Sequence, residues 1–217
     1  MSGVKSKSPG LLANLFAPSD EQNMWRVQTS GDPEAFARVV NRWQEPIHHL
    51  CARMTGDAVR AEDLTQEIFT KVFTRAKDFQ PTAKFSTWLW RIALNHCYDE
   101  LRRTKRRSES SLDADDVDSF SELTSLAPSP DAQTASEEEC ALVRASLLRL
   151  PEISRTVLAL RYCEGLKLRE ISEILDLPES TIHSRIAVAL AQITRLLEPS
   201  FRDPDDPRPK RFPQAVL

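Results

Sequence analysis

Residues 150–197 read LPEISRTVLALRYCEGLKLREISEILDLPESTIHSRIAVALAQITRLL. The stretch predicts two short helices, a tight connection and then a helix-turn-helix whose second helix begins at Ser180 or Thr181. Apolar residues of that second helix recur at helical spacing and are expected to pack inward: Ile182, Ile186, Ala189, Leu190, Ile193 and Leu197.

The opposite face of the same helix is polar. Its side chains are Ser180, Thr181, Ser184 and Arg185, with His183 at the border. Short polar side chains and an arginine near a helix N-terminus suit the major groove of DNA. A helical hairpin that only packs against its neighbours has the same spacing, so this stretch alone leaves both interpretations open.

A second stretch, residues 57–107, reads DAVRAEDLTQEIFTKVFTRAKDFQPTAKFSTWLWRIALNHCYDELRRTKRR. It predicts a helix over 58–76 with Leu64, Ile68 and Val72 facing a core, beside a stripe of polar residues. A long helix over 85–103 follows, and its inward residues repeat every four positions: Phe85, Leu89, Ala93, Cys97 and Leu101. Taken without the first stretch, the polar stripe is typical of any solvent-exposed helix.

Together the two stretches resemble the extracytoplasmic-function (ECF) sigma factors of bacterial RNA polymerase. AEDLTQEIFTKVF, residues 61–73, is similar to the polymerase-binding helix of that family. FSTWLWRIALNHCYDELRR, residues 85–103, is similar to its minus-ten-element helix. Residues 150–175 followed by STIHSR are similar to its minus-thirty-five module. The resemblance covers about residues 31–107 and 137–197.

The resemblance implies a transcription initiation factor that is not an enzyme and has no catalytic residues. It binds core RNA polymerase and promoter DNA, helps to open the minus-ten region, and has an anti-sigma factor as a further partner. The residues expected to contact the polymerase are Asp63, Gln66 and Glu67. In the family, the loop before the minus-ten helix, here residues 79–84, captures a flipped base.

DNA contacts are expected from polar and basic residues in both halves of the chain. The minus-ten candidates are Lys84, Arg91, Asn95, Arg102 and Arg103. The upstream candidates are Lys167, Arg169, Ser180, Thr181, His183, Ser184 and Arg185. The family's recognition helix carries several basic residues after its threonine, whereas here Arg185 is nearly alone. Fewer phosphate contacts predict weaker and less salt-dependent binding to the upstream element, unless Lys167, Arg169 and Arg195 compensate.

The fold is predicted to be all-α, with two small helical domains joined by a flexible acidic linker and the helix-turn-helix in the C-terminal domain. The expected segments are a flexible tail (1–20), a region 2 domain (21–107), the linker (108–136), a region 4 domain (137–198) and a proline-rich, non-helical tail (199–217). Residues 108–139 hold ten acidic and no basic residues, which leaves the rest of the chain at +7 against −3 overall. The linker is either a spacer or an RNA mimic that occupies positively charged channels of the polymerase.

Other functional classes have little support. No apolar run approaches membrane-spanning length, and the N-terminus lacks a convincing cleavage site, so we expect a cytoplasmic protein with no membrane insertion. The four cysteines contain no CxxC pair and are expected to be reduced thiols. The histidines and cysteines form no convergent set, so neither a metal nor another cofactor is expected. The remaining alternatives are a stand-alone helix-turn-helix regulator and a sigma-mimicking interaction module.

Overall fold

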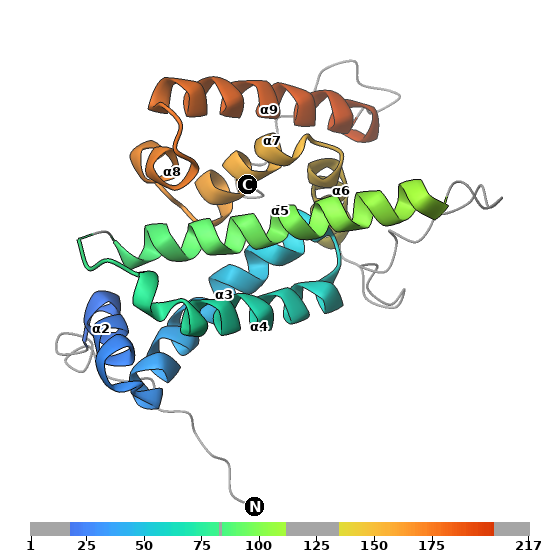
Figure 1. Cartoon of the computed structure of the whole chain (residues 1–217). Coiled ribbons are helices and arrows are strands. Elements are labelled where there is room, and N and C mark those ends of the chain that lie inside the picture. The colour runs from blue at the N-terminus through green and yellow to red at the C-terminus, as the bar shows by residue number, and fades with distance from the viewer. Residues whose placement is uncertain (1–17, 83, 112–134, 202–217) are drawn as a thin grey trace, which may run out of the picture.

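The computed structural model describes residues 18–82, 84–111 and 135–201 (Figure 1). All the regular elements within these ranges are helical, as predicted. They are α2 (Asp20–Ser30), α3 (Pro33–Thr55), α4 (Ala58–Thr74), the 3-10 turn η1 (Ala76–Asp78), α5 (Phe85–Ser111), α6 (Ala135–Leu148), α7 (Glu152–Leu158), the π-helical turn η3 (Ala159–Cys163), α8 (Leu168–Leu175) and α9 (Glu179–Phe201).

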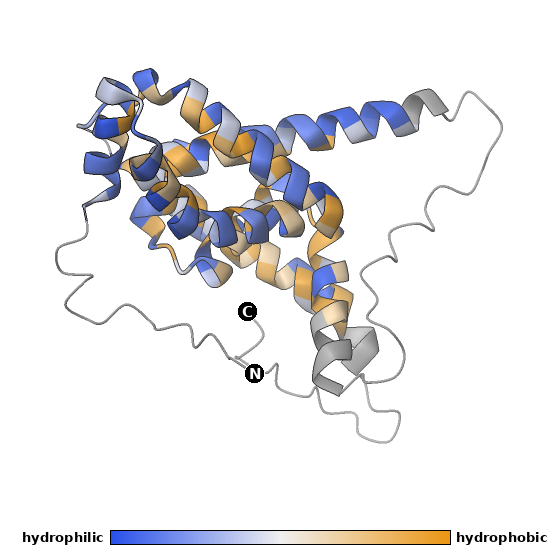
Figure 2. Cartoon of the chain, turned by 90° about the horizontal axis from the view of Figure 1, so that it is seen from below, coloured by the Kyte–Doolittle hydropathy of each residue, from blue (hydrophilic) through white to orange (hydrophobic). Residues whose placement is uncertain are grey.

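Helix α5 crosses the middle of the molecule and separates two groups of helices (Figure 1). Helices α2, α3 and α4 lie on one side of it, and α7, α8 and α9 lie on the other. The C-terminal part of α5 continues past the bundle as an almost wholly hydrophilic rod (Figure 2). This part of α5 is hydrophilic because five of residues 102–108 are Arg or Lys, and all seven residues are exposed.

The helix starts follow local capping chemistry. Asp32 accepts hydrogen bonds from the N–H groups of Glu34 and Ala35, and Pro33 occupies the first helical position of α3. Gly56 ends α3 at φ +78°, and a Cβ there would lie 2.6 Å from Leu148 Cδ1. Glycine is therefore required at position 56 both by the backbone angle and by the close approach of α6.

Several helix assignments differ from the sequence prediction. Helix α4 ends at Thr74 rather than at residue 76, where the chain enters the 3-10 turn η1. Helix α2 was not predicted, although Ser19 and Gln22 form a reciprocal capping box at its start. Helix α5 runs to Ser111 rather than Arg103, because its polar end needs no packing to be helical in a lysine- and arginine-rich segment. The expectation that the chain after Glu198 is non-helical is wrong up to Phe201, since one proline removes only one backbone N–H near a helix end.

Several expectations fall outside the described residues. These are the tail at 1–17, the linker at 112–134 and the proline-rich tail at 202–217. Where side chains are described, Cys51 and Cys97 are buried free thiols with their Sγ atoms 3.7 Å apart. The predicted core position of Cys97 is confirmed. Trp90 is only 2% exposed, because it packs edge-on against Trp43.

The two predicted domains pack directly against each other. Arg53 of α3 pairs with Glu164 at 2.9 Å, and the Tyr98 hydroxyl of α5 lies 2.8 Å from Thr156 Oγ1. Arg155 of α7 is only 7% exposed and donates to the backbone carbonyl of Met54 in α3. No described helix is long and apolar enough to cross a membrane. No group of three or more His, Cys, Asp or Glu side chains among the described residues could hold a metal ion.

Candidate polymerase-binding and DNA-binding surfaces

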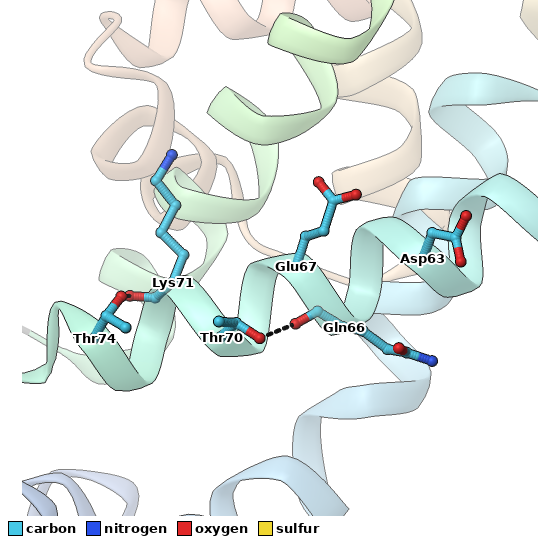
Figure 3. Close-up of a pocket in the computed structure, with 6 residues that line it drawn as sticks. All are labelled: Asp63, Gln66, Glu67, Thr70, Lys71 and Thr74. Atoms are coloured by element: carbon cyan, nitrogen blue, oxygen red, sulfur yellow. Dashed lines mark hydrogen bonds between the residues drawn. The ribbon is translucent and has the colours of Figure 1, made fainter.

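One face of α4 is an open, polar hollow of about 600 Å³. Leu64, Ile68 and Val72 are fully buried on the other side of the helix, which fixes the rotation of α4 against the core. The hollow is lined by Asp63, Gln66, Glu67, Thr70, Lys71 and Thr74. All six belong to this one helix, with Glu67 and Lys71 projecting to the same side (Figure 3). The three predicted polymerase-binding residues therefore share one accessible surface.

An arginine that the sequence analysis did not select organises this surface. Arg60 donates to both carboxylate oxygens of Glu100 on α5, at 2.9 Å each. Its Nη1 also donates to Glu67 Oε1 at 3.0 Å and lies 3.6 Å from Asp63 Oδ2. His96 Nε2 lies 2.7 Å from the other oxygen of Glu67. Two of the three predicted polymerase contacts thus belong to a charge network that joins α4 to α5.

The network shifts the acidity of its members. Hydrogen bonds from Arg60 outweigh burial and hold the pKa of Glu100 below its usual range. Burial acts to raise the pKa of Glu67, but hydrogen bonds from His96 and Arg60 lower it overall. Bonding to Glu100 raises the pKa of Arg60 further above its ordinary value. Both carboxylates are therefore charged at neutral pH, and the hollow presents negative charge beside Lys71.

The predicted minus-ten residues lie along α5 and just before it. Asn95, Arg102 and Arg103 are exposed, and the two arginines make exposed or weak pairs with Asp99 and Glu100. Lys84 pairs with Glu170 of α8 at 3.7 Å. Arg91 donates to the carbonyls of Glu173 and Ile174, at the C-terminal end of α8. Exposed carbonyls at a helix C-terminus attract cations, which accounts for the contact of Arg91 with the end of α8.

The predicted upstream residues divide into accessible and enclosed ones. Ser180, His183 and Ser184 are exposed near the N-terminus of α9, and Thr181 is half-buried beside them. Lys167, the N-cap of α8, and Arg169, in its first turn, are exposed, and Arg169 pairs with Glu173. Arg185 is half-buried, and its Nε is enclosed without a hydrogen-bond partner. The guanidinium of Arg185 is therefore less exposed to solvent than its position on the polar face of the helix predicted.

Two family models match the chain. Sigma-70 region 2 matches residues 39–107, and Sigma-70 region 4 matches residues 140–193. The first match contains α4 and most of α5, and the second contains the helix-turn-helix of α8 and α9. Together they cover the helices that carry the α4 hollow and the two sets of candidate DNA-binding residues.

The chain is also similar to curated sigma factors over most of their length. It is 36% identical to the ECF RNA polymerase sigma factor SigW of Bacillus subtilis over 72% of this chain and 85% of SigW. It is 35% identical to the RNA polymerase sigma-H factor of Pseudomonas aeruginosa over 87% of this chain and 99% of that protein. The chain is 33% identical to the ECF RNA polymerase sigma-E factor of Escherichia coli over 85% of this chain and 97% of that protein.

Solved structures share the fold. CnrH, solved in complex with the cytosolic domain of CnrY, superposes with a TM-score of 0.63 at 23% identity, covering 84% of this chain and 99% of CnrH. RpoE of Bartonella quintana, solved with the anti-sigma factor NepR, gives a TM-score of 0.59 at 20% identity. The match covers 75% of this chain and 96% of RpoE. From the family matches and the curated relatives, this chain belongs to the ECF sigma factors, the non-enzymatic initiation factors that bind RNA polymerase and direct it to promoters.

Proposed function

We propose that the α4 hollow is the surface by which this sigma factor binds core RNA polymerase, with Asp63, Gln66 and Glu67 as contacts. One observation carries the assignment: the hollow is accessible and lined by residues with polar side chains, while the opposite face of the same helix is fully buried. A helix held so firmly on one side can present a fixed pattern of charge on the other. Glu67 differs from its neighbours because Arg60 and His96 already hold its carboxylate.

The first prediction concerns Asp63 and Gln66, which can be changed without touching the core. Asp63→Ala with Gln66→Ala should weaken core-polymerase binding about tenfold or more, because removing one partner of a buried, hydrogen-bonded charge pair at an interface costs about 2–5 kcal/mol. Binding is measured by fluorescence anisotropy of labelled protein titrated with core enzyme. Gln44→Ala with Glu45→Ala, a matched exposed pair on α3, should bind normally. Undiminished affinity of the α4 variant would remove this face from the interface.

We further propose that α5 and residues 79–84 contact the minus-ten region, and that α8 and α9 contact the upstream element. The exposed basic end of α5 supports phosphate binding, which supplies affinity without base selection. Exposed Ser180, His183 and Ser184 support base contacts from the start of α9. Binding of Arg91 to a phosphate would replace its present contacts with the carbonyls of α8.

The second prediction tests Arg185. Arg185→Ala should lower the affinity for upstream-element DNA by about 1–3 kcal/mol if the guanidinium reads a base edge. If it contacts only phosphate, affinity should fall equally on cognate and scrambled duplexes. The measurement is a fluorescence titration of both duplexes with purified protein. Arg149→Ala, which removes an exposed arginine outside the candidate DNA surface, is the control and should bind normally. An unchanged affinity of Arg185→Ala for both duplexes would exclude Arg185 from the DNA surface.

We also propose an anti-sigma factor as a regulatory partner and the cytoplasm as the working compartment. The fold shared with RpoE of Bartonella quintana, a sigma factor solved in complex with the anti-sigma factor NepR, supports the first. The proposed domain limits remain 21–107 and 137–198, and the first domain contains all of α2 except Asp20. Run-off transcription with core polymerase tests the whole assignment, because a stand-alone DNA-binding regulator or a sigma mimic would not start promoter-specific RNA.

A further inference from the structure

The chain between η1 and α5 is exposed at its tip and anchored at its base. Gln80, Pro81, Thr82 and Lys84 are exposed, whereas Phe79 is only 3% exposed. The Phe79 ring lies 5.7 Å from Phe85 and 5.4 Å from Trp88, measured between ring centroids. The aromatic cluster holds the base of this loop but leaves the direction of its backbone to be set by other contacts.

Gln28 of α2 fixes the backbone where the loop begins. Its Nε2 donates to the carbonyl oxygens of Ala76 at 2.7 Å and Phe79 at 2.6 Å. Because the peptide group is planar, a bond to the Phe79 carbonyl sets the orientation of the peptide that leads into Gln80. The two bonds span 48 and 51 positions of sequence, so they are tertiary contacts rather than part of a local turn.

Glu21 of the same helix fixes the backbone where the loop ends. Its Oε1 accepts a hydrogen bond from the N–H of Phe85, the first residue of α5, at 3.0 Å. A carboxylate at this position complements the positive end of the α5 dipole. Burial acts to raise the pKa of Glu21, but the hydrogen bond from Phe85 and others lower it overall, so the group is charged at neutral pH.

Helix α2 is itself held rigidly enough to act as a reference. Met24 and Val27 are buried in the core, and the Trp43 indole N–H donates to Asp20 Oδ2 at 3.0 Å. The capping box of Ser19 and Gln22 closes the start of the helix. Because α2 is fixed to the core in this way, the hydrogen bonds of Gln28 and Glu21 fix both ends of the loop relative to α3, α4 and α5.

We propose that Gln28 and Glu21 are positioning residues for minus-ten recognition: they hold residues 79–82 and Lys84 in the shape that accepts a base of the promoter. The inference rests on the proposed role of this loop in DNA binding. It adds a function to α2, which lies outside the 39–107 segment matched by the region 2 family model. Neither residue needs to touch DNA.

Gln28→Glu is the sharpest test, because it keeps the size of the side chain and replaces the donor with a carboxylate facing two carbonyl oxygens. Holoenzyme assembled with each variant selects DNA from a library randomised in its upstream and minus-ten segments, and the bound DNA is sequenced. We expect Gln28→Glu to lower the base preference at one or more minus-ten positions about tenfold, the effect of losing two neutral hydrogen bonds. Upstream preference and core-polymerase affinity should be unchanged.

Gln44→Glu is the matched control, since it makes the same charge change at an exposed site on α3 and should select like the unaltered protein. Glu21→Ala provides an independent variant at the other end of the loop, and it should affect the same positions. Lowering the pH should partly restore Gln28→Glu, because a protonated carboxyl can donate again. Recovery on protonation would show that the missing donor at position 28 causes the loss of preference.

The outcomes separate this inference from the function on which it rests. If the unaltered holoenzyme selects no minus-ten sequence, the proposed role of the loop fails. If it does select one, and a folded Gln28→Glu or Glu21→Ala selects the same bases with the same preference, only the positioning role fails. Loss of preference in both variants with normal polymerase binding establishes it.

Discussion

Replacing Arg155 with methionine should lower the free energy of unfolding by about 3–5 kcal/mol, the largest stability effect we expect from one substitution. The buried guanidinium donates to four backbone carbonyls at once. Three belong to the end of α6 and the turn after it: Leu147 at 3.2 Å, Leu148 at 2.7 Å and Leu150 at 3.3 Å. The fourth is the carbonyl of Met54, near the C-terminus of α3. Two helix ends whose carbonyls have few other donors thus share one cation.

Methionine fills much of the same volume but donates no hydrogen bond, so the carbonyls of Leu148, Leu150 and Met54 would lose this donor. The carbonyl of Leu147 would keep the hydrogen bond from the Leu150 N–H. Urea unfolding followed by far-UV circular dichroism measures the loss. Arg155→Lys keeps the positive charge but lacks the planar set of guanidinium donors. Its free energy of unfolding should therefore lie between those of the unaltered protein and Arg155→Met. Arg149→Met, at an exposed position in the same turn, should change stability by less than about 0.5 kcal/mol. Equal stability of Arg155→Met and Arg149→Met would contradict the assigned role.

Replacing Arg60 with alanine should have the second largest effect, and it should affect stability and polymerase binding together. The side chain of Glu100 is only 7% exposed, so without its bidentate partner a buried carboxylate remains largely uncompensated. We expect a loss of about 2–3 kcal/mol. Glu67 would also lose one of its two hydrogen-bond partners, so its carboxylate would be less firmly positioned in the α4 hollow. We expect this loss to weaken core-polymerase binding.

The pH dependence gives a second readout of the same pair. The pKa of Glu100 is lowered in the folded protein, so its contribution is present at pH values above the ordinary value of about 4.5 and is lost as the pH falls. The stability difference between the unaltered protein and Arg60→Ala should therefore shrink in acid. Arg75→Ala, which removes an exposed pair with Asp78, should cost about 1 kcal/mol or less at any pH. A difference between the unaltered protein and Arg60→Ala that stays constant down to pH 3 would rule out Glu100 as the partner that matters.

Local pattern was enough to predict much of this protein. The four-residue repeat through Leu64, Ile68 and Val72 identified the buried face of α4, and hence the opposite face where the hollow lies. The same reasoning placed Cys97 in the core and the second helix of the helix-turn-helix near Ser180. These features depend on the 3.6-residue period and on caps within a few positions, which a sequence displays directly.

Helix α2 was within reach of sequence reasoning and was still missed. The pair Ser19 and Gln22 forms a capping box, and Gly31 ends the helix at φ +63°. Its hydrophobic face is narrow, with only Met24 and Val27 as buried apolar residues, so periodicity was a weak signal there. Residues 108–111 and 199–201 were mistaken in the same way, because polar and proline-containing helix ends lack an apolar stripe.

By itself, the sequence determined most of the helical elements, their buried faces and the family, because each of these is written in short motifs. Only the tertiary structure decided the partners of the charged and polar side chains. Arg60 meets Glu100 across 40 positions, Gln28 meets Phe79 across 51, and Arg155 meets Met54 across 101. An isolated arginine or glutamine on a helix surface has the same local pattern whether it binds DNA, a carboxylate or a carbonyl. Its partner is chosen by how the helices pack, and periodicity carries no information about that choice.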